Sequence, residues 1–540
     1  MMKKNYLIFL LASMVIIFGS NFFIAQDTIE ERPVSTSSSN EKSEFQVSEN
    51  SYVVSDELAD VPEEFVNEGI KFSTPLFDGR ISKLGGHIFD VRLKKYSDKP
   101  QGGEPTKIME KGEYISNTII KAKDINIPKK INFNYNNSNF NLISGPGKLD
   151  LISKFGQVTI QKSFLFDSNS YGVEQQIIVT NKSSKNLVFR VFEESIGQVD
   201  AGEYSVMGYY LDNEMEVVDY IPSETEKIIG DFDWHGLSKK YFLTSTIIGN
   251  LGEKTLKFNK FSSNSVRSLL SYKTINLMPG ASYTTSSTVF LGPKDPDILA
   301  KFGNNFAEAH DLGWFGWLAV PLEKLLKISY KFVNNYGFAI ILITLLIRII
   351  FLPLTIKSMM SMKKMQSKMA LMKPKLDAIK EQYKDDKTTQ NSEIMKLYSK
   401  EGVNPLSSLS GCLPMLVQIP VFVALYNVLL YSLDLRHSEF LWISDLSSAE
   451  MLFDIPGTGI PFRILPLVMG ISWFLTQKLT PPNPGADEFQ TKIFQYMPIM
   501  FTVMFWGLPS GLILYWTVSN IISIFQQLYI NKKFEKMQGA

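Results

Sequence analysis

The sequence predicts a protein of two unlike parts, an α-helical polytopic membrane core with six spans and a large β-sandwich domain outside the membrane. Long uncharged apolar runs near the N-terminus and in about the last 200 residues predict the spans, since about 20 apolar residues cross a bilayer. Between these runs, apolar and polar residues alternate with a period of two, which is typical of half-buried strands. The mean hydropathy near zero conceals this contrast between the parts.

The N-terminus begins with lysines and continues with about twenty uncharged residues up to Ala25. We expect residues 1–25 to form an uncleaved membrane anchor; a signal peptide is the alternative, but Phe23 stands where signal cleavage requires a small side chain. Residues 26–56 are rich in Ser, Glu and Asn and poor in apolar side chains, which predicts a disordered linker.

The β-sandwich is predicted over residues 57–300. Runs such as 158–166 and 283–289 alternate between apolar and polar side chains. Turn signals such as Asp78-Gly79 and Pro279-Gly280 separate many of these runs, as in other all-β domains.

Residues 301–335 change to a helical pattern. Leu322, Leu326 and Phe332 fall on one face of this predicted helix, while lysines line another. With Trp314 just before it, the segment predicts an interfacial amphipathic helix lying on the membrane. An ordinary surface helix of the soluble domain is the alternative.

Five further spans are expected after residue 335. The stretch 336–354 has one charge, Arg348, and 412–433 has none, so each has the composition of one span. The 38 uncharged residues of 493–530 would make one helix about 57 Å long, so they must turn back near Pro509. The predicted order is a span at 336–354, a cytoplasmic helical hairpin at 355–411, a span at 412–433, a periplasmic loop at 434–459, a span at 460–479, a cytoplasmic loop at 480–492, spans at 493–508 and 509–530, and a cytoplasmic tail at 531–540.

Charge sets the expected orientation. Residues 355–411 carry eleven lysines against six acidic residues, whereas residues 434–463 carry two arginines against five acidic residues. Positively charged loops stay in the cytoplasm, so the first loop and both lysine-bearing termini are expected inside. The β-domain then lies outside, which in a bacterium is the periplasmic side of the inner membrane.

Composition and motif content exclude several functions. The formal net charge of +1, from 55 basic and 54 acidic residues, provides no general field for binding DNA. One cysteine permits no internal disulfide, and four scattered histidines have no metal-ligand spacing. The sequence contains no phosphate-binding loop, nucleophile elbow or metalloprotease helix. We therefore expect no cofactor, no metal and no enzymatic activity.

Polar groups within the spans are the candidate functional residues. Arg348 lies about twelve residues into its span, and intramembrane arginines commonly mark function, although snorkelling of the side chain to the interface is the alternative. Thr344 is one turn earlier on the same face. In the last span, polar side chains recur at three- and four-residue spacing, and in the span at 412–433 Gln418 adds an amide. Together they suggest a hydrated cavity; interhelical hydrogen bonding alone is the other interpretation. The last-span residues are Trp516, Ser519, Asn520, Ser523 and Gln527.

The cytoplasmic hairpin holds six methionines within fourteen residues, from Met359 to Met372. Flexible thioethers suit the recognition of varied hydrophobic segments. Packing against a return helix through Ile394, Leu397 and Tyr398 is the favoured interpretation.

Four segments resemble the YidC-type membrane protein insertases in their long Gram-negative form, and the resemblance covers nearly the whole chain. Two departures from the family pattern are Trp516, where an aromatic hydroxyl is common, and a longer link at 407–410. The segments are Ile347-Arg348-Ile-Ile-Phe-Leu-Pro353-Leu-Thr355, Val403-Asn404-Pro405-Leu406, Gly411-Cys412-Leu-Pro414-Met-Leu-Val-Gln418-Ile-Pro420-Val-Phe422, and Pro509-Ser510-Gly511-Leu-Ile-Leu-Tyr515-Trp516-Thr-Val-Ser519-Asn520.

The resemblance implies a five-helix bundle, behind the N-terminal helix, with a hydrophilic groove open to cytoplasm and lipid. Arg348 would be the charge of this groove, and clients would leave along a greasy surface, without nucleotide hydrolysis. The implied groove residues are Arg348, Thr344, Gln418, Trp516, Ser519 and Ser523. The implied client-slide residues are Ile419, Pro420, Phe422, Phe501 and Phe505.

The expected function is therefore that of an insertase and chaperone for client membrane proteins in the lipid bilayer. The expected partners are the Sec translocon and the ribosome or signal recognition machinery, bound through the cytoplasmic loop and tail. A secondary transporter or a membrane-anchored envelope-glycan enzyme are the alternatives. A transporter usually shows repeated halves, which are not visible, and a glycan enzyme needs paired carboxylates in the β-domain.

Overall fold

The computed structural model describes residues 69–538, apart from 101, 136–138, 201–204, 250–251, 402–412, 458, 460 and 481–487. The chain divides into two compact units, the first ending at His310 and the second beginning at Asp311. The predicted anchor at 1–25, the predicted linker at 26–56 and the link at 407–410 lie outside the described residues.

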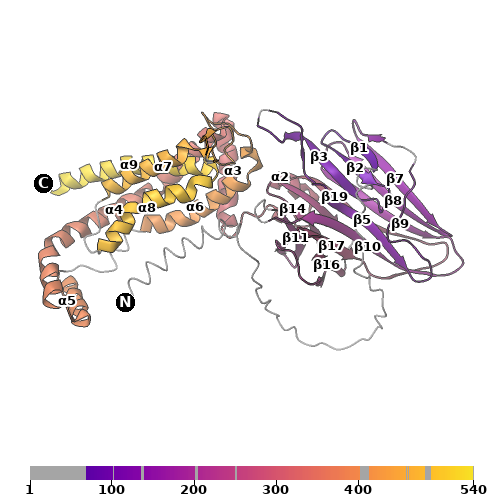
Figure 1. Ribbon diagram of the computed structural model, residues 1–540, viewed down its shortest axis with the longest axis horizontal. Coiled ribbons are helices and arrows are strands. Elements are labelled where there is room, and N and C mark those ends of the chain that lie inside the picture. Colours follow the sequence, from indigo (N-terminus) through magenta and orange to yellow (C-terminus); the bar gives the residue numbers. More distant parts are fainter. Residues whose placement is uncertain are drawn as a thin grey trace. The chain divides into compact units, whose positions relative to one another are not determined.

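The first unit consists of two large sheets with antiparallel pairing, except that β1 and β6 are parallel (Figure 1). One sheet has the order β13 (Glu226–Gly230), β16 (Lys254–Lys260), β17 (Ser265–Ser271), β10 (Leu187–Gln198), β5 (Tyr114–Ala122), β3 (Ile88–Ser97), β2 (Phe77–Ser82), β1 (Gly69–Ser73) and β6 (Asn139–Asn141), with β18 (Ile275–Leu277) on β10 and β4 (Pro105–Lys107) on β3. The other has the order β12 (Glu214–Val218), β11 (Val206–Leu211), β14 (Trp234–Ser238), β15 (Phe242–Ile248), β19 (Ser282–Pro293), β9 (Gly172–Asn181), β8 (Val158–Asp167) and β7 (Pro146–Phe155).

The predicted β-sandwich is confirmed. The alternating run at 158–166 lies in β8, whose inward side chains Val158, Ile160 and Phe164 are fully buried. Burial of one face of each sheet fixes the strand register, because a shift by one residue would turn this apolar face outward.

The boundary after the sandwich differs from the prediction. The chain continues with α2 (Pro296–Leu299) and two 3-10 turns, η2 (Ala300–Phe302) and η3 (Phe306–Ala309). The ring of Phe306 packs against Trp234 and Phe290 of the sheet. These turns therefore belong to the β unit, and the helix predicted over 301–335 forms only from Gly316.

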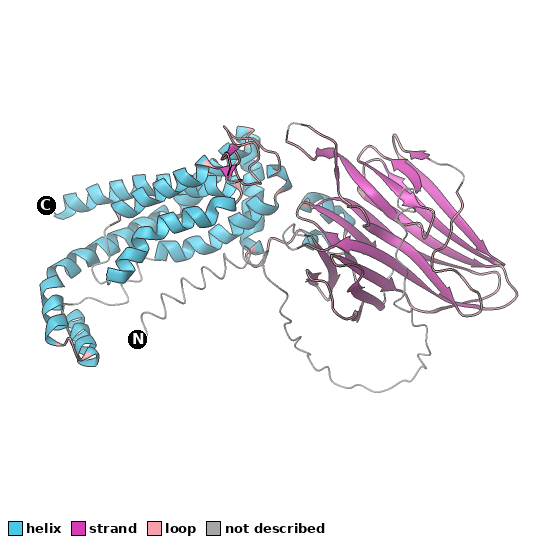
Figure 2. Ribbon diagram, viewed as in Figure 1, coloured by secondary structure: helices cyan, strands magenta, loops and turns pink. Residues whose placement is uncertain are grey.

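The second unit is helical (Figure 2). Its elements are α3 (Gly316–Val333), α4 (Tyr336–Gln382), α5 (Lys387–Lys400), α6 (Leu413–Tyr431), η5 (Leu433–Leu435), β20 (Phe453–Asp454), β21 (Pro461–Phe462), α7 (Ile464–Leu479), α8 (Glu488–Met504), η6 (Phe505–Gly507) and α9 (Ser510–Gln538). Helix α9 packs on α4 and α7, and α3 packs on α4 and α6. The predicted turn near Pro509 is confirmed, because η6 ends just before α9 begins.

Helix α3 is amphipathic, but its faces differ from the prediction. Leu322 and Leu326 are buried, whereas Phe332 is 77% exposed and does not share their face. Trp314 and Trp317 are also exposed. The exposed rings have the character expected of a membrane interface, and the placement of α3 at that interface stays a prediction.

Helix α4 is longer than predicted. It continues through Pro353 without a break, so the predicted span at 336–354 and the first arm of the hairpin form one helix. A proline inside a helix removes one backbone hydrogen bond, which the remaining bonds of a 47-residue helix outweigh here. By length and composition, α4 is the one described helix that meets the criteria for a membrane span on its own, and the segments Gln418–Tyr431 and Ile464–Leu479 are shorter apolar helices.

The predicted packing of the methionine-rich segment is confirmed. Met369, Met372 and Leu376 of α4 form a buried cluster. Ile394, Leu397 and Tyr398 of α5 pack against this cluster, as does Met365. The methionines thus serve to hold the two arms of the hairpin together.

Candidate functional site

The candidate site lies where α4 and α9 run side by side. Arg348 is twelve residues after Tyr336, the first residue of α4, which corresponds to a rise of about 18 Å. Its Nε and Nη2 atoms donate hydrogen bonds to the Oγ atom of Ser519 at 3.0 and 2.6 Å. The structure therefore brings Arg348 of α4 into contact with Ser519, one residue of the polar stripe of the last helix.

Arg348 has a neutral partner rather than a carboxylate. Within the described part of the chain, its guanidinium forms no salt bridge, and Ser519 is a single hydroxyl with two acceptor lone pairs. A guanidinium has five N–H donors, so donors remain for water or for an incoming acceptor. Because the side chain is half-buried, this unneutralised charge is partly accessible.

Tyr515 connects this pair to a third helix, α6. The Nε2 atom of Gln418 donates a hydrogen bond to the Tyr515 hydroxyl. That hydroxyl also interacts with Ser519 and lies near the charge of Arg348. Tyr515 is missing from the predicted site, although its position one turn before Ser519 is a signal that could have identified it. Arg348, Gln418, Tyr515 and Ser519 together form the polar cluster.

Two other predicted groove residues make local bonds instead. Thr344 is fully buried, and its hydroxyl donates to the carbonyl of Ile340 at 2.6 Å, within α4. Ser523 donates to the carbonyl of Ser519 at 2.9 Å, within α9. Both bonds follow the common i to i−4 pattern of helical hydroxyls, so neither side chain joins the polar cluster.

Trp516 does not face the polar cluster, which corrects the expectation that it lines the groove. It follows Tyr515 directly, and successive helical residues point about 100° apart. Its ring instead packs against Phe422, Phe505 and Trp473, with centroids 4.7, 5.0 and 5.4 Å away. This is an aromatic core between helices.

The structure also differs from the predicted client slide, because three of its aromatic residues are packed between helices. Phe422, Phe501 and Phe505 are 5%, 4% and 1% exposed, so they cannot contact a client in this conformation. Ile419 and Pro420 are half-buried and keep some accessible surface. In a membrane protein, apolar residues face both lipid and neighbouring helices, so hydrophobicity alone could not separate the two.

The remaining stripe residues hold α9 to α7. The Nδ2 atom of Asn520 donates to the Ser472 hydroxyl at 3.1 Å, and the Nε2 atom of Gln527 donates to the Thr480 hydroxyl at 2.6 Å. For these two residues, the alternative interpretation of interhelical hydrogen bonding is correct.

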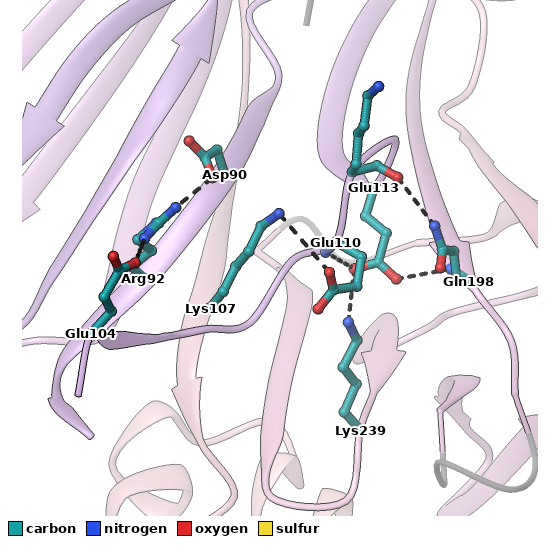
Figure 3. Close-up of polar contacts among 9 residues, drawn as sticks. Asp90, Arg92, Glu104, Lys107, Glu110, Glu113, Gln198 and Lys239 are labelled. Atoms are coloured by element: carbon teal, nitrogen blue, oxygen red, sulfur yellow. Dashed lines mark hydrogen bonds and ion pairs between the residues drawn. The ribbon is translucent and has the colours of Figure 1, made fainter. Parts of the chain in front are cut away.

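Several acidic residues of the β unit are engaged in structural contacts, as Figure 3 shows for one part of it. Arg92 pairs with Glu104 at 2.9 Å, and Lys239 pairs with Glu113 at 2.9 Å. Glu113 also accepts backbone hydrogen bonds from Glu110 and Gln198. Carboxylates held in this way do not have the arrangement of a glycosidase acid and base. No metal-binding group was found among the described residues.

Fold and site together define a class: a protein with a β-sandwich unit and a helical unit in which an arginine of a long apolar helix is hydrogen-bonded by a serine hydroxyl of another helix. Residues 69–325 match the YidC periplasmic domain family, and residues 328–537 match the 60Kd inner membrane protein family. The chain belongs to the YidC family of membrane protein insertases.

Individual relatives agree with this assignment. A membrane protein insertase YidC of Pelobacter propionicus is 35% identical over 551 residues, covering 98% of this chain and 99% of that protein. A membrane protein insertase YidC of Geotalea daltonii is 35% identical and covers 86% of each chain. A solved structure described as an active YidC insertase with its first transmembrane domain resolved covers 84% of this chain and 90% of that one, at 18% identity and a TM-score of 0.35.

The family confirms several predictions. Its members are inner-membrane insertases with a periplasmic domain and are not enzymes. The β unit is accordingly the periplasmic domain, and the predicted family is correct. The transporter and glycan-enzyme alternatives receive no support from the family.

Proposed function

We propose that this protein inserts client transmembrane helices into the inner membrane. In this proposal, the charge of Arg348 stabilises the polar client segment that must cross the bilayer. The observation that carries this proposal is the neutral coordination of Arg348 by Ser519, with guanidinium donors left over. An acidic client tail would supply the missing acceptor and lower its own desolvation penalty halfway across the bilayer. Burial of the client's apolar helix in lipid then drives release, without nucleotide hydrolysis.

The proposed topology has six spans with both termini in the cytoplasm. The positions of Arg348 and Gln418 support it, since they stand 12 residues after the start of α4 and 13 residues before the end of α6. Both counts correspond to about 20 Å of helix rise, so in the proposed topology the polar cluster would lie inside a hydrocarbon core of about 30 Å. In this topology the predicted anchor at 1–25 and the helices α4, α6, α7, α8 and α9 would be the six spans.

The Sec translocon, the ribosome and the signal recognition machinery are proposed partners at the cytoplasmic side. The α4–α5 hairpin is rich in lysine, and its buried methionines hold it together as a unit that can be presented to a partner. Such lysines would also contact anionic lipid headgroups.

The test is insertion of a single-span client with an acidic outer tail into liposomes that contain only the purified protein. Wild type should insert the client without nucleotide. Arg348→Ala should reduce insertion by about tenfold or more, since an ionic hydrogen bond contributes about 1.5–3 kcal/mol. Arg348→Lys should restore much of it, because a lysine keeps the charge.

A client with a neutral tail provides the matched control for charge. Its insertion should depend much less on Arg348. Ser519→Ala and Ser523→Ala provide a matched pair one turn apart, of which only the first removes a partner of Arg348. Equal loss for both clients, or no loss in Arg348→Ala, would contradict the charge mechanism.

A further inference from the structure

The segment between α6 and α7 closes one end of the helical unit. Residues 432–450, called here the capping segment, lie at the end where α4 begins, opposite the α4–α5 hairpin (Figure 2). The segment has few regular elements, and Leu441 and Trp442 are exposed, yet four of its apolar side chains are buried as in a core. Leu435, Phe440, Ile443 and Leu446 are 0%, 5%, 3% and 0% exposed.

The capping segment is hydrogen-bonded to the starts of two helices, α9 and α4. At the start of α9, the backbone N–H groups of Ser510 and Gly511 donate to the carbonyls of Ser448 and Leu446 at 2.7 and 2.8 Å. At the start of α4, the Nδ2 atom of Asn335 donates to the carbonyl of Glu439 at 3.1 Å. The first N–H groups of a helix have no partner within it, so the capping segment satisfies two of them at α9. At α4 the contact is made by the side chain of the residue that precedes the helix.

Glu450 joins the capping segment to α7. Its carboxylate is 5% exposed and accepts hydrogen bonds from the backbone N–H of Leu465 at 2.6 Å and from the indole N–H of Trp442 at 2.5 Å. A negative charge at a helix N-terminus is also favoured by the helix dipole. Arg463, just before α7, donates to the carbonyl of Trp506, which lies just before the start of α9.

The capping segment packs closely against the first turns of α4 and α9. A Cβ atom on Gly337 would lie 2.1 Å from the Phe440 ring, and one on Gly511 would lie 3.0 Å from the Leu446 carbonyl. The helices can therefore approach the capping segment only because glycine stands at both positions. Tyr515 follows Gly511 by one helical turn, so the polar cluster lies one turn along α9 from the contacts with the capping segment.

We propose that Glu450 is a positioning residue that locks the capping segment over the periplasmic end of the helical unit, sealing the polar cluster from the periplasm. This rests on the proposed function, because it supposes that the polar cluster is the site where client tails wait within the membrane. Without this closure, water from the periplasmic side would reach Arg348. The water would then compete with a client for the guanidinium donors.

The experiment measures access to a buried thiol from the periplasmic side. In the full chain with Cys412→Ser, a reporter Thr344→Cys is placed one turn before Arg348, at a fully buried position. Cells with permeabilised outer membranes are treated with a charged, membrane-impermeant maleimide. The reporter should be nearly unreactive with Glu450 intact, and Glu450→Ala should raise its labelling rate about tenfold or more, because a buried ionic acceptor is lost.

Asp445→Asn is the matched control, since it removes another carboxylate from the capping segment. Among the described residues, this carboxylate accepts hydrogen bonds from Ser447 alone. The substitution should leave labelling unchanged. If Glu450→Ala fails to accumulate, Trp442→Phe removes one donor to Glu450, keeps a ring, and should raise labelling by a smaller factor. Protection that persists in the folded Glu450 variant, or equal labelling in Asp445→Asn, would overturn the proposal. Labelling needs no client, so this outcome is distinct from a failure of insertion.

Discussion

Two arginines, one in each unit of this protein, have opposite kinds of partner. In the β unit, Arg267 meets Glu194 at 3.0 Å with both side chains at most 5% exposed, and Glu194 also accepts hydrogen bonds from Tyr114 and Asn117. In the helical unit, Arg348 donates hydrogen bonds to a serine hydroxyl and has no carboxylate partner among the described residues. A charge that is fully paired inside the protein has no capacity left for a ligand, whereas one that is underpaired does. The difference in pairing therefore distinguishes the charge of Arg267, which stabilises the fold, from the charge of Arg348, which can still bind a ligand.

The largest effect expected from this comparison is on the stability of the β unit. Glu194→Ala would leave Arg267 buried without its carboxylate, which should lower local stability by about 3–5 kcal/mol. Hydrogen exchange of peptides from β10 and β17 in the full-length protein would measure the change.

Lys148 provides the exposed counterpart. It pairs with Asp150 at 3.1 Å, with side chains 50% and 38% exposed. Lys148→Ala should change stability by about 0–1 kcal/mol, because solvent screens exposed pairs. Similar exchange rates in the Glu194 and Lys148 variants would mean that the buried pair is not the structural element described here.

The second-largest effect is expected from a substitution that gives Arg348 a carboxylate partner, as Arg267 has in the β unit. Ser519→Asp gives the guanidinium an internal carboxylate, so the charge should be neutralised while Arg348 itself remains. Insertion of acidic-tailed clients should fall by about tenfold, which corresponds to the 1.4 kcal/mol of a modest competing ion pair. The liposome assay measures this, and thermal unfolding should show a fold at least as stable as that of wild type. Undiminished insertion would argue that free guanidinium donors are not needed.

Acid should weaken the β unit through two buried histidines. Burial lowers the pKa of His87 to about 3, aided by the charge of Lys162, and lowers the pKa of His235 to about 4. Below the ordinary pKa of 6.5, the unfolded state takes up protons that the folded state cannot accept until near pH 4 to 3. Stability is therefore greatest above pH 6.5 and declines as the pH falls toward 3.

From pH 6.5 to 5.5, this linkage should remove about 1 kcal/mol per histidine. Hydrogen exchange of the β unit at the two pH values measures the decline, after correction for the intrinsic exchange rate. His235→Gln should remove about half of the slope, whether or not it changes stability itself. An unaltered slope would mean that His235 does not titrate as described.

Local pattern was enough to predict the strands but not the partners of polar helix residues. Period-two alternation located β8 and β19, because one face of each is buried. The polar stripe of α9 was also visible, yet Ser519 and Asn520 point about 100° apart and bond to different helices. Which neighbour each one meets depends on helix packing, and sequence periodicity contains no information about that.

Other misses have similar causes. The burial of Phe422 in an aromatic core could not be read from its hydrophobicity, since lipid-facing residues are equally apolar. The continuation of α4 past Pro353 was missed because the change from apolar to lysine-rich composition suggested the end of an element. A change in composition does not require a helix to end, and α4 continues to Gln382.

The smallest expected effect tests the polar residues assigned to helix packing. Asn520→Leu removes the hydrogen bond to Ser472 between α9 and α7, which should lower stability by only about 0.6 kcal/mol, as is typical of such bonds within membranes. Insertion of acidic-tailed clients should remain near the wild-type level, because Asn520 does not contact Arg348. Thermal unfolding in detergent and the liposome assay check the two parts. A loss of insertion as large as that in Ser519→Asp would show that the whole polar stripe acts as one unit, and the distinction between structural and functional polar groups on α9 would then have to be abandoned.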